Sequence, residues 1–227
     1  MEFDFLYSTI IPFTEFKELS VRNLNNDSDT ITIMDNDKEL IYFITGNQHK
    51  YLEILDLFKT AKVNYQLKQK DLPMIEIQAN TLKEVALYKL QSIKELINSS
   101  YFIEDAGFFV DVPLNGFPGV YSKYVLHTIG NDGILRLIED FDSTKAHFEA
   151  VIALYHKPQD KILVFKGKVE GFISPKPRGE YGFGFDPIFI STEFPYKTFA
   201  EMATSEKNQI SHRAKAWNQM LKYLTEN

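Results

Sequence analysis

The sequence predicts an α/β protein built around a mixed β-sheet. In the first half of the chain, apolar strand patterns are interleaved with amphipathic helix patterns, beginning with a buried-strand pattern at residues 40–45 and a helix pattern at residues 48–59. In the second half, strand patterns follow one another at residues 146–155, 161–168 and 169–174. Strands mixed with helices, together with a run of consecutive strands, indicate an α/β architecture with a mixed sheet.

The elements between these two regions are predicted from shorter patterns. The helix over 48–59 is expected to place Leu52, Leu55 and Phe58 on one face. A short strand at 63–67 follows. We then expect a helix over 82–97, whose apolar stripe consists of Ala86, Leu90, Ile93 and Ile97.

The remaining elements complete the predicted sheet and its cover. Strand-like stretches lie at 101–104 and 108–110, a short helix at 132–139 and a further strand at 187–190. The last helix, over 211–224, has Ser211 as a suitable N-cap. Its apolar face has the spacing i, i+3, i+4 and i+7 and consists of Trp217, Met220, Leu221 and Leu224.

Composition limits the class of protein. The chain has 227 residues, of which 44% are hydrophobic, enough for a substantial core in one domain with or without an appendage. The absence of cysteine excludes a disulfide framework, a cysteine-ligated metal site and a thiol nucleophile. No apolar run approaches the roughly 20 residues of a membrane span, and the N-terminus carries acidic residues where a secretory signal carries basic ones. We therefore expect a soluble, cytoplasmic protein.

The net charge of −6 is concentrated at the N-terminus. Residues 1–39 contain 9 acidic and 3 basic residues, so the rest of the chain is neutral. A neutral body argues against a nucleic-acid polymer as partner but not against a small phosphorylated ligand. A polar, turn-rich stretch at 23–39 marks a boundary. We predict an N-terminal extension of unknown role over 1–39 and one domain over 40–227.

The first candidate site is the segment TGNQHK at 45–50, between the first strand and the first helix. The N-terminus of a helix presents backbone N–H groups to an anion, and Gly46 allows close approach. Lys50 lies one turn into the helix, within reach of a phosphate. The alternative is an ordinary strand–helix turn with a solvated lysine.

Carboxylates form the second candidate. Glu104 and Asp105 end an apolar strand pattern, and Glu76 lies in another apolar context. Carboxylates without cysteine or histidine neighbours suit Mg²⁺. The five histidines (49, 127, 147, 156 and 212) show no metal-ligand spacing. The alternatives are a solvated turn for Glu104 and Asp105 and an edge-strand acid for Glu76.

Three further segments combine glycine, aromatic and basic residues. Segment 115–124 (NGFPGVYSKY) predicts a rigid aromatic loop, which suits either a nucleotide-facing wall or a packed surface loop. Segment 179–187 (GEYGFGFDP) lacks the dinucleotide-binding glycine order, and Pro187 blocks the helix that would have to follow, so NAD binding is excluded. Its phenylalanines suit stacking on a base. Segment 207–213 (KNQISHR) enters the last helix with two cations, a hydroxyl and an imidazole.

These segments occur in the order TGNxxK, an acid, EDxG, GFPGxYSKY, GFGFDP and K…SHR. This set resembles the inosine triphosphate pyrophosphatase family, the dITP/XTP pyrophosphatases, over about residues 40–224. The resemblance implies an elongated two-lobed fold with a long mixed β-sheet, flanking helices and an active-site cleft between the lobes. It also implies a homodimer that hydrolyses ITP, dITP and XTP to the monophosphate and pyrophosphate with Mg²⁺.

The resemblance assigns roles position by position. Asp105 would prepare the attacking water, and Glu76 and Asp105 would hold Mg²⁺, although the spacing after Glu76 is one residue longer than is common. The triphosphate would be held by Thr45, Gly46, Asn47 and Lys50, with Lys89 and Lys123 also reaching the phosphates. The base and ribose would be bound by Phe183, Gly184, Phe185, Asp186, Lys207, Ser211, His212 and Arg213.

One position departs from the family pattern, and two other readings stay open. The family commonly has Ser or Thr after the Glu-Asp pair, whereas this chain has Ala106 and loses a hydroxyl contact there. A pyrophosphatase of similar shape could act on modified pyrimidine nucleotides, dUTP or dTTP, against which GFGFDP and K…SHR argue. A catalytically silent nucleotide-binding protein is the other reading, against which the retained Glu76, Asp105 and Lys50 argue.

Overall fold

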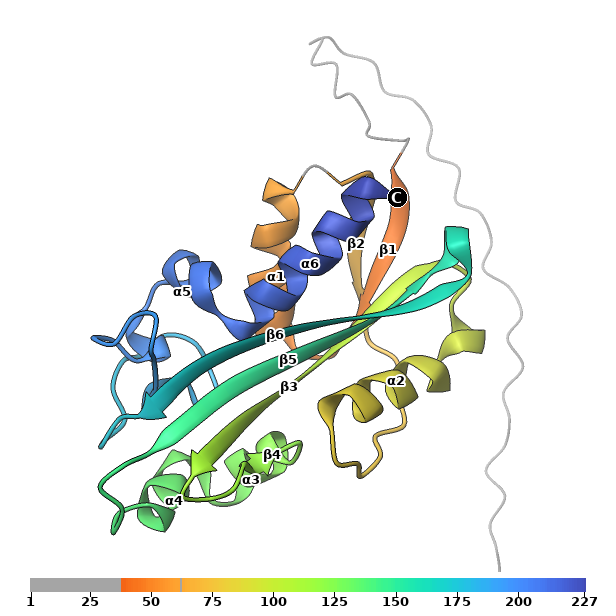
Figure 1. Ribbon diagram of the computed structural model, residues 1–227. Coiled ribbons are helices and arrows are strands. Elements are labelled where there is room, and N and C mark those ends of the chain that lie inside the picture. The colour runs from red at the N-terminus through yellow and green to blue at the C-terminus, as the bar shows by residue number, and fades with distance from the viewer. Residues whose placement is uncertain (1–37, 62) are drawn as a thin grey trace, which may run out of the picture. The chain divides into compact units, whose positions relative to one another are not determined.

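The structure is a computed structural model that describes residues 38–61 and 63–227 (Figure 1). The described strands form one seven-stranded sheet in the order β2-β1-β3-β5-β6-β7, with β4 pairing to β3. β1 pairs in parallel with β2 and β3, and the other pairs are antiparallel, which confirms the predicted mixed sheet. The strands are β1 (Glu39–Ile44), β2 (Tyr65–Lys70), β3 (Ser100–Val112), β4 (Phe117–Gly119), β5 (Lys145–His156), β6 (Lys161–Ile173) and β7 (Phe189–Ser191).

Helices cover both faces of this sheet. Figure 1 shows α1 and α6 on one side of the long strands and α2 on the other, with α3 and α4 toward one end. None of the described helices is long and apolar enough to cross a membrane. The helices are α1 (Gln48–Thr60), α2 (Leu82–Ser92), α3 (Ser122–Thr128), α4 (Gly130–Leu137), α5 (Thr204–Ile210) and α6 (His212–Glu226).

The hydrophobic core consists of separate clusters of buried residues, which lie at different ends of the long strands. Near β1, the indole of Trp217 on α6 packs edge-on against Phe43 and Phe102, at centroid distances of 6.0 and 4.8 Å. On the opposite face of the same strands, Ile103 packs in a cluster with α2, because successive strand residues point to opposite faces. At the other end a separate cluster surrounds Phe108 and Phe148 and includes residues of α3 and α4. This division matches the two lobes that the resemblance implies.

The middle of β3 is open at one edge. β1 pairs with β3 at residues 100–102, and β4 pairs with it at residues 108–110, on the side opposite β5. In the described part of the chain, no strand pairs with residues 103–107 on that side. Glu104 and Asp105 therefore lie at an exposed backbone edge in the interior of the sheet, between the two core regions.

A glycine in β6 allows the first turn of α6 to approach the sheet closely. A Cβ atom at Gly167 of β6 would overlap the backbone carbonyl oxygen of His212. The side chain of Ser211 caps α6 by accepting a hydrogen bond from the backbone N–H of Ala214 at 3.1 Å. Close approach and capping together fix the first turn of α6 against the sheet.

Most predicted elements are confirmed within about two residues, and the differences have local causes. The stretches 101–104 and 108–110 are one strand, β3, and 161–168 and 169–174 are one strand, β6. Gly107 interrupts the side-chain pattern of β3 without ending the strand, and the boundary expected at 168/169 does not exist, because β6 continues to Ile173. The predicted strand at 187–190 begins as a 3₁₀ turn at Asp186–Ile188, since Pro187 cannot donate to a ladder. Helices α3 and α5, seven residues each, were not predicted.

Two further predictions need correction. The helix predicted over 82–97 ends at Ser92 and is followed by a 3₁₀ turn at Lys94–Leu96. In α1, Leu52 is not on the buried face but is 54% exposed, and the buried positions are Glu53, Ile54 and Phe58. The predicted extension lies outside the described residues apart from Lys38 and Glu39, and Glu39 already belongs to β1.

Candidate active site

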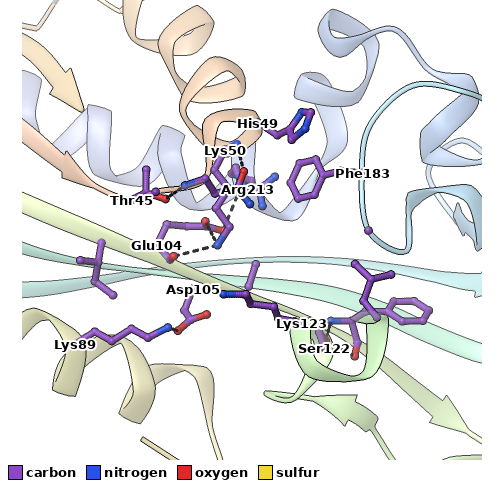
Figure 2. Close-up of a pocket in the computed structure, with 18 of the residues that line it drawn as sticks. Thr45, His49, Lys50, Lys89, Glu104, Asp105, Ser122, Lys123, Phe183 and Arg213 are labelled. Atoms are coloured by element: carbon purple, nitrogen blue, oxygen red, sulfur yellow. Dashed lines mark hydrogen bonds and ion pairs between the residues drawn. The ribbon is translucent and has the colours of Figure 1, made fainter. Parts of the chain in front are cut away.

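The open edge of β3 forms the floor of a cleft of about 870 Å³ (Figure 2). Its walls come from the β1–α1 turn, the segment after β2, α2, α3, the loop at 183–186 and the start of α6. All of the residues predicted to bind substrate or metal line this cleft, with the exception of Ser211. Segments more than 150 residues apart in sequence therefore meet in one place.

The β1–α1 turn presents a helix N-terminus to the cleft. Asn47 is the N-cap of α1, and its side chain accepts a hydrogen bond from the backbone N–H of Lys50 at 3.1 Å. The Nζ of Lys50 lies 2.8 Å from a carboxylate oxygen of Glu104 and donates to the Glu104 carbonyl at 3.2 Å. That carbonyl belongs to the open stretch of β3. Lys50 thus holds the helix N-terminus, an anion-binding arrangement, over the open edge.

Two carboxylates converge on one ammonium group in the cleft. The Nζ of Lys89, on α2, lies 3.0 Å from Glu76 and 2.7 Å from Asp105. Burial acts to lower the pKa of Lys89, but its two carboxylate partners raise it, so the lysine is a cation at neutral pH. Burial also acts to raise the pKa of Glu76, and the hydrogen bond and charge of Lys89 lower it. Glu76 and Asp105 therefore converge on one position, which the ammonium group of Lys89 occupies in this structure.

A buried network of charges forms part of the cleft wall. Glu53 on α1 accepts from the Nζ of Lys207 at 3.0 Å and from the guanidinium of Arg213. Arg213 also donates to Glu104 at 3.3 Å, and Lys207 to Asp186 at 2.6 Å. The five side chains are each at most 10% exposed. The network joins α1, β3, the 183–186 loop, α5 and α6.

The network fixes the protonation states of its carboxylates. Burial acts to raise the pKa of Glu53, but the charges of Arg213 and Lys207 outweigh it and lower the pKa to about 2. The pKa of Glu104 is likewise raised by burial and lowered more strongly by Arg213 and Lys50. Both groups are therefore carboxylates at neutral pH.

His212 is held neutral beside this network. Burial, followed by the positive charges of Arg213 and Lys207, lowers its pKa well below the usual range. Its ring stacks on Phe148 at a centroid distance of 4.7 Å. The Nδ1 atom is buried and has no hydrogen-bond partner in the structure. A ligand in the cleft can supply one, because His212 lines it.

Phe183 forms an aromatic wall opposite these cations. Its ring centroid lies 5.2 Å from the Nζ of Lys207 and 5.3 Å from the Cζ of Arg213. The imidazole of His49 stacks on the same ring at 5.5 Å, as Figure 2 shows. Asp186 holds the loop by accepting from the backbone N–H of Phe183 at 2.8 Å. This arrangement suits a flat aromatic ligand.

Three of the residues singled out in the sequence have other roles, or offer the cleft less, than the resemblance implies. Phe185 is mainly a core residue, 3% exposed and stacked on Phe108 at 4.9 Å. Ser211 does not line the cleft but caps α6, which positions His212 and Arg213. Ala106 lines the cleft and offers no hydroxyl.

Sequence reasoning missed two residues of this site. Glu53 is an acidic residue at a buried position of α1, a signal that the wrong assignment of Leu52 to the buried face concealed. His49 stacks on Phe183 from a distant segment, and no local pattern could indicate that contact.

A family model for the Ham1 family matches residues 41–223. The chain belongs to the Ham1 family. A dITP/XTP pyrophosphatase of Thermococcus kodakarensis is 46% identical over 186 residues, which cover 82% of this chain and 97% of that protein. A dITP/XTP pyrophosphatase of Hyperthermus butylicus is 43% identical, with coverage of 82% and 94%. These relatives confirm the resemblance drawn from the motifs.

A solved structure agrees with the fold of this Ham1 chain. The structure of a HAM1 protein from Coxiella burnetii matches with a TM-score of 0.72 and 30% identity. The match covers 83% of this chain and all of that one.

The buried network of this Ham1 protein predicts a pH-dependent stability. Since the folded-state pKa of Glu53 is about 2 and its ordinary value is 4.5, the ion pairs contribute fully above about pH 4.5 and are lost as pH falls through 2. The difference corresponds to roughly 3 kcal/mol. We expect Glu53→Gln to lower the free energy of unfolding at pH 7, and its stability curve to converge with that of the wild type near pH 2.

Chemical denaturation monitored by circular dichroism between pH 2 and pH 7 measures this difference. Asp56→Asn, at an exposed position of the same helix, is the control and should follow the wild type. A Glu53→Gln curve parallel to the wild type over the whole range would contradict the assignment.

Proposed function

We propose that this protein hydrolyses the deaminated purine nucleoside triphosphates ITP, dITP and XTP to the monophosphate and pyrophosphate. The names of the relatives support this substrate class. One observation carries the proposal: a single cleft contains the carboxylates of Glu76 and Asp105, which converge on one cation, together with the N-terminus of α1 and the aromatic ring of Phe183. Carboxylates for a metal ion, a helix N-terminus for phosphates and an aromatic ring for a base are the groups that a nucleoside triphosphate requires.

The carboxylate pair suits Mg²⁺, which the function requires. Oxygen ligands without sulfur or imidazole are those that Mg²⁺ prefers, and Glu76 and Asp105 supply them at one position. Bound there, the ion would neutralise phosphate charge and polarise the α-phosphoryl group. Asp105 would orient the attacking water and accept its proton.

The lysines of the cleft would bind the triphosphate. Lys50, Lys89 and Lys123 all line the cleft, together with the backbone N–H groups at the start of α1. A triphosphate carries about four negative charges, and fixed cations at the leaving pyrophosphate stabilise the charge that develops there. No covalent nucleophile is needed in this scheme.

Recognition of the base would depend on groups that donate hydrogen bonds. Lys207 and Arg213 have donors and no acceptors, and they lie over Phe183, where a purine ring would stack. A 6-oxo group accepts from those N–H groups of the two side chains that the carboxylates do not occupy, whereas the 6-amino group of adenine cannot accept from them. A site of this kind rejects the amino purine.

The proposal includes a homodimer in the cytoplasm with no nucleic-acid partner. The homodimer comes from the family resemblance, and the cytoplasmic location from the composition of the sequence. The last is supported by the neutral charge of residues 40–227.

Asp105→Asn tests the catalytic assignment. The amide cannot accept the proton of the attacking water, so we expect kcat to fall by about 10²–10⁴-fold with little change in the circular dichroism spectrum. Asp111→Asn is the matched control, because it makes the same change on the same strand outside the cleft. Near-normal turnover of Asp105→Asn would remove Asp105 from the mechanism.

A nucleotide panel with Mg²⁺ tests the substrate and the bond broken. We expect kcat/KM for ITP, dITP and XTP to exceed that for ATP, since each unpaired buried donor costs roughly 1–3 kcal/mol, a factor of about 5 to 150. Pyrophosphate and the monophosphate should form in equal amounts. Equal kcat/KM for ITP and ATP, preference for dUTP or dTTP, release of orthophosphate alone, or binding without turnover would each refute the proposal.

A shortened chain tests the domain boundary. The matched region covers 97% and 94% of the two relatives but only 82% of this chain. This difference supports a catalytic domain that does not need the N-terminal extension. A chain beginning at Lys38 should fold and retain the kcat/KM of the full chain for ITP. Loss of cooperative thermal unfolding would show that the extension belongs to the core.

A further inference from the structure

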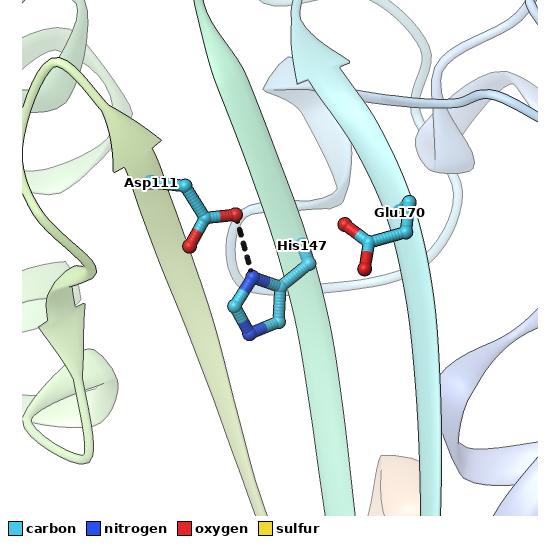
Figure 3. Close-up of side chains that lie close together, drawn as sticks. All are labelled: Asp111, His147 and Glu170. Carbon is cyan, nitrogen blue, oxygen red and sulfur yellow. Dashed lines mark hydrogen bonds and ion pairs between the residues drawn. The ribbon is translucent and has the colours of Figure 1, made fainter.

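A second group of metal-ligating side chains lies outside the cleft. Asp111, His147 and Glu170 come from the adjacent strands β3, β5 and β6, as Figure 3 shows. One ligand atom from each residue lies within 4.8 Å of those of the other two. None of the three lines the cleft. His147 lies four residues along β5 from Val151, the partner of Asp105, which is about 13 Å at the rise of a strand.

The strand register brings these residues together. His147 is directly opposite Glu170 in the β5–β6 pair. Asp111 lies at a bulge, since the pairing of β3 with β5 shifts between Val110 and Val112. A bulge re-aims the side chain of the extra residue, and here the carboxylate of Asp111 reaches the Nδ1 of His147 at 2.7 Å.

The imidazole of His147 is held in a fixed orientation. It stacks on Phe109 at a centroid distance of 4.5 Å and an interplanar angle of 3°. The side chain is 11% exposed, so one edge remains accessible. A buried, oriented imidazole beside two carboxylates loses little side-chain entropy when it binds an ion.

We propose that Asp111, His147 and Glu170 bind a divalent transition-metal ion such as Zn²⁺. Imidazole nitrogen and carboxylate oxygen are both ligands of Zn²⁺, and the two negative charges of the carboxylates balance the charge of the ion. Two ligands at about 2.0–2.1 Å from one tetrahedral ion are about 3.3 Å apart. The Nδ1 of His147 lies 2.7 Å from the carboxylate of Asp111, and the three ligand atoms all lie within 4.8 Å of one another, so modest side-chain movements would bring them to this spacing.

The ion has to displace existing polar contacts. Asp111 gives up its hydrogen bond to His147, and Glu170 gives up an ion pair with Lys168 at 2.7 Å. The side chain of Lys168 is 45% exposed and can return to water at little cost. The neighbouring pair of Lys166 and Glu149 remains, at 3.9 Å. The bound ion would link the strands β3, β5 and β6 and stabilise the fold.

Zinc binding to the full chain tests this site. We expect the wild type to bind one Zn²⁺ ion in equilibrium dialysis, and its Tm to rise by about 5–10 °C at a hundredfold excess over Kd. Glu170→Gln and His147→Gln should weaken Zn²⁺ binding by about tenfold or more and remove most of the Tm shift. Glu149→Gln, on the same face of β5, is the matched control and should bind as the wild type does.

The outcomes separate this site from the cleft. Unchanged pyrophosphate release by Glu170→Gln in Mg²⁺, with loss of the Zn²⁺-dependent Tm shift, supports the proposal. Glu170 is exposed, so this variant remains informative if His147→Gln fails to fold. Absence of Zn²⁺ binding by the wild type overturns the proposal. Binding that survives Glu170→Gln and His147→Gln but is lost in Asp105→Asn also overturns it, because the ion then lies in the cleft.

Discussion

The open stretch of β3 between β1 and β4 is the constraint on which the site depends. A strand in the interior of a sheet normally has hydrogen-bonded neighbours on both sides, but residues 103–107 have one only toward β5 in the described structure. Lys50 satisfies the exposed carbonyl of Glu104 from the start of α1. Because successive residues of a strand point to opposite faces, Glu104 is directed to Arg213 and Lys50, and Asp105 to Lys89. One strand therefore supplies both halves of the cleft.

The buried charges connect this strand to the rest of the molecule. Removing ions from water costs several kcal/mol for each, so the network is tolerated only because Glu53, Glu104 and Asp186 pair with Lys207 and Arg213. The arrangement also fixes which groups remain available to a ligand: donors from Lys207 and Arg213, and the unpaired Nδ1 of a neutral His212. Under the proposed function, selectivity for a base and stability of the fold would thus depend on the same contacts.

Local patterns predicted the parts of the protein that short segments determine. The strand before Thr45, the helix after it and the α6 cap at Ser211 follow from adjacent residues. Of the residues that the motifs assigned to the site, all but Ser211 line the cleft. Glu53 was missed because its partners Lys207 and Arg213 are more than 150 residues away. The grouping of Asp111, His147 and Glu170 depends on strand register and a bulge, which no spacing in the sequence encodes.

The long strands explain how two polar groupings coexist without interfering. β3 and β5 run through both core regions, so a side chain on one of them keeps its position relative to the others on the same sheet. Asp105 and Asp111 lie on the same strand, yet the aromatic ring of Phe109 stands between them, stacked on His147. This ring separates the carboxylates of the cleft from those at the bulge. A charge or ion bound at one position can therefore affect the other through its electric field, but not through direct contact.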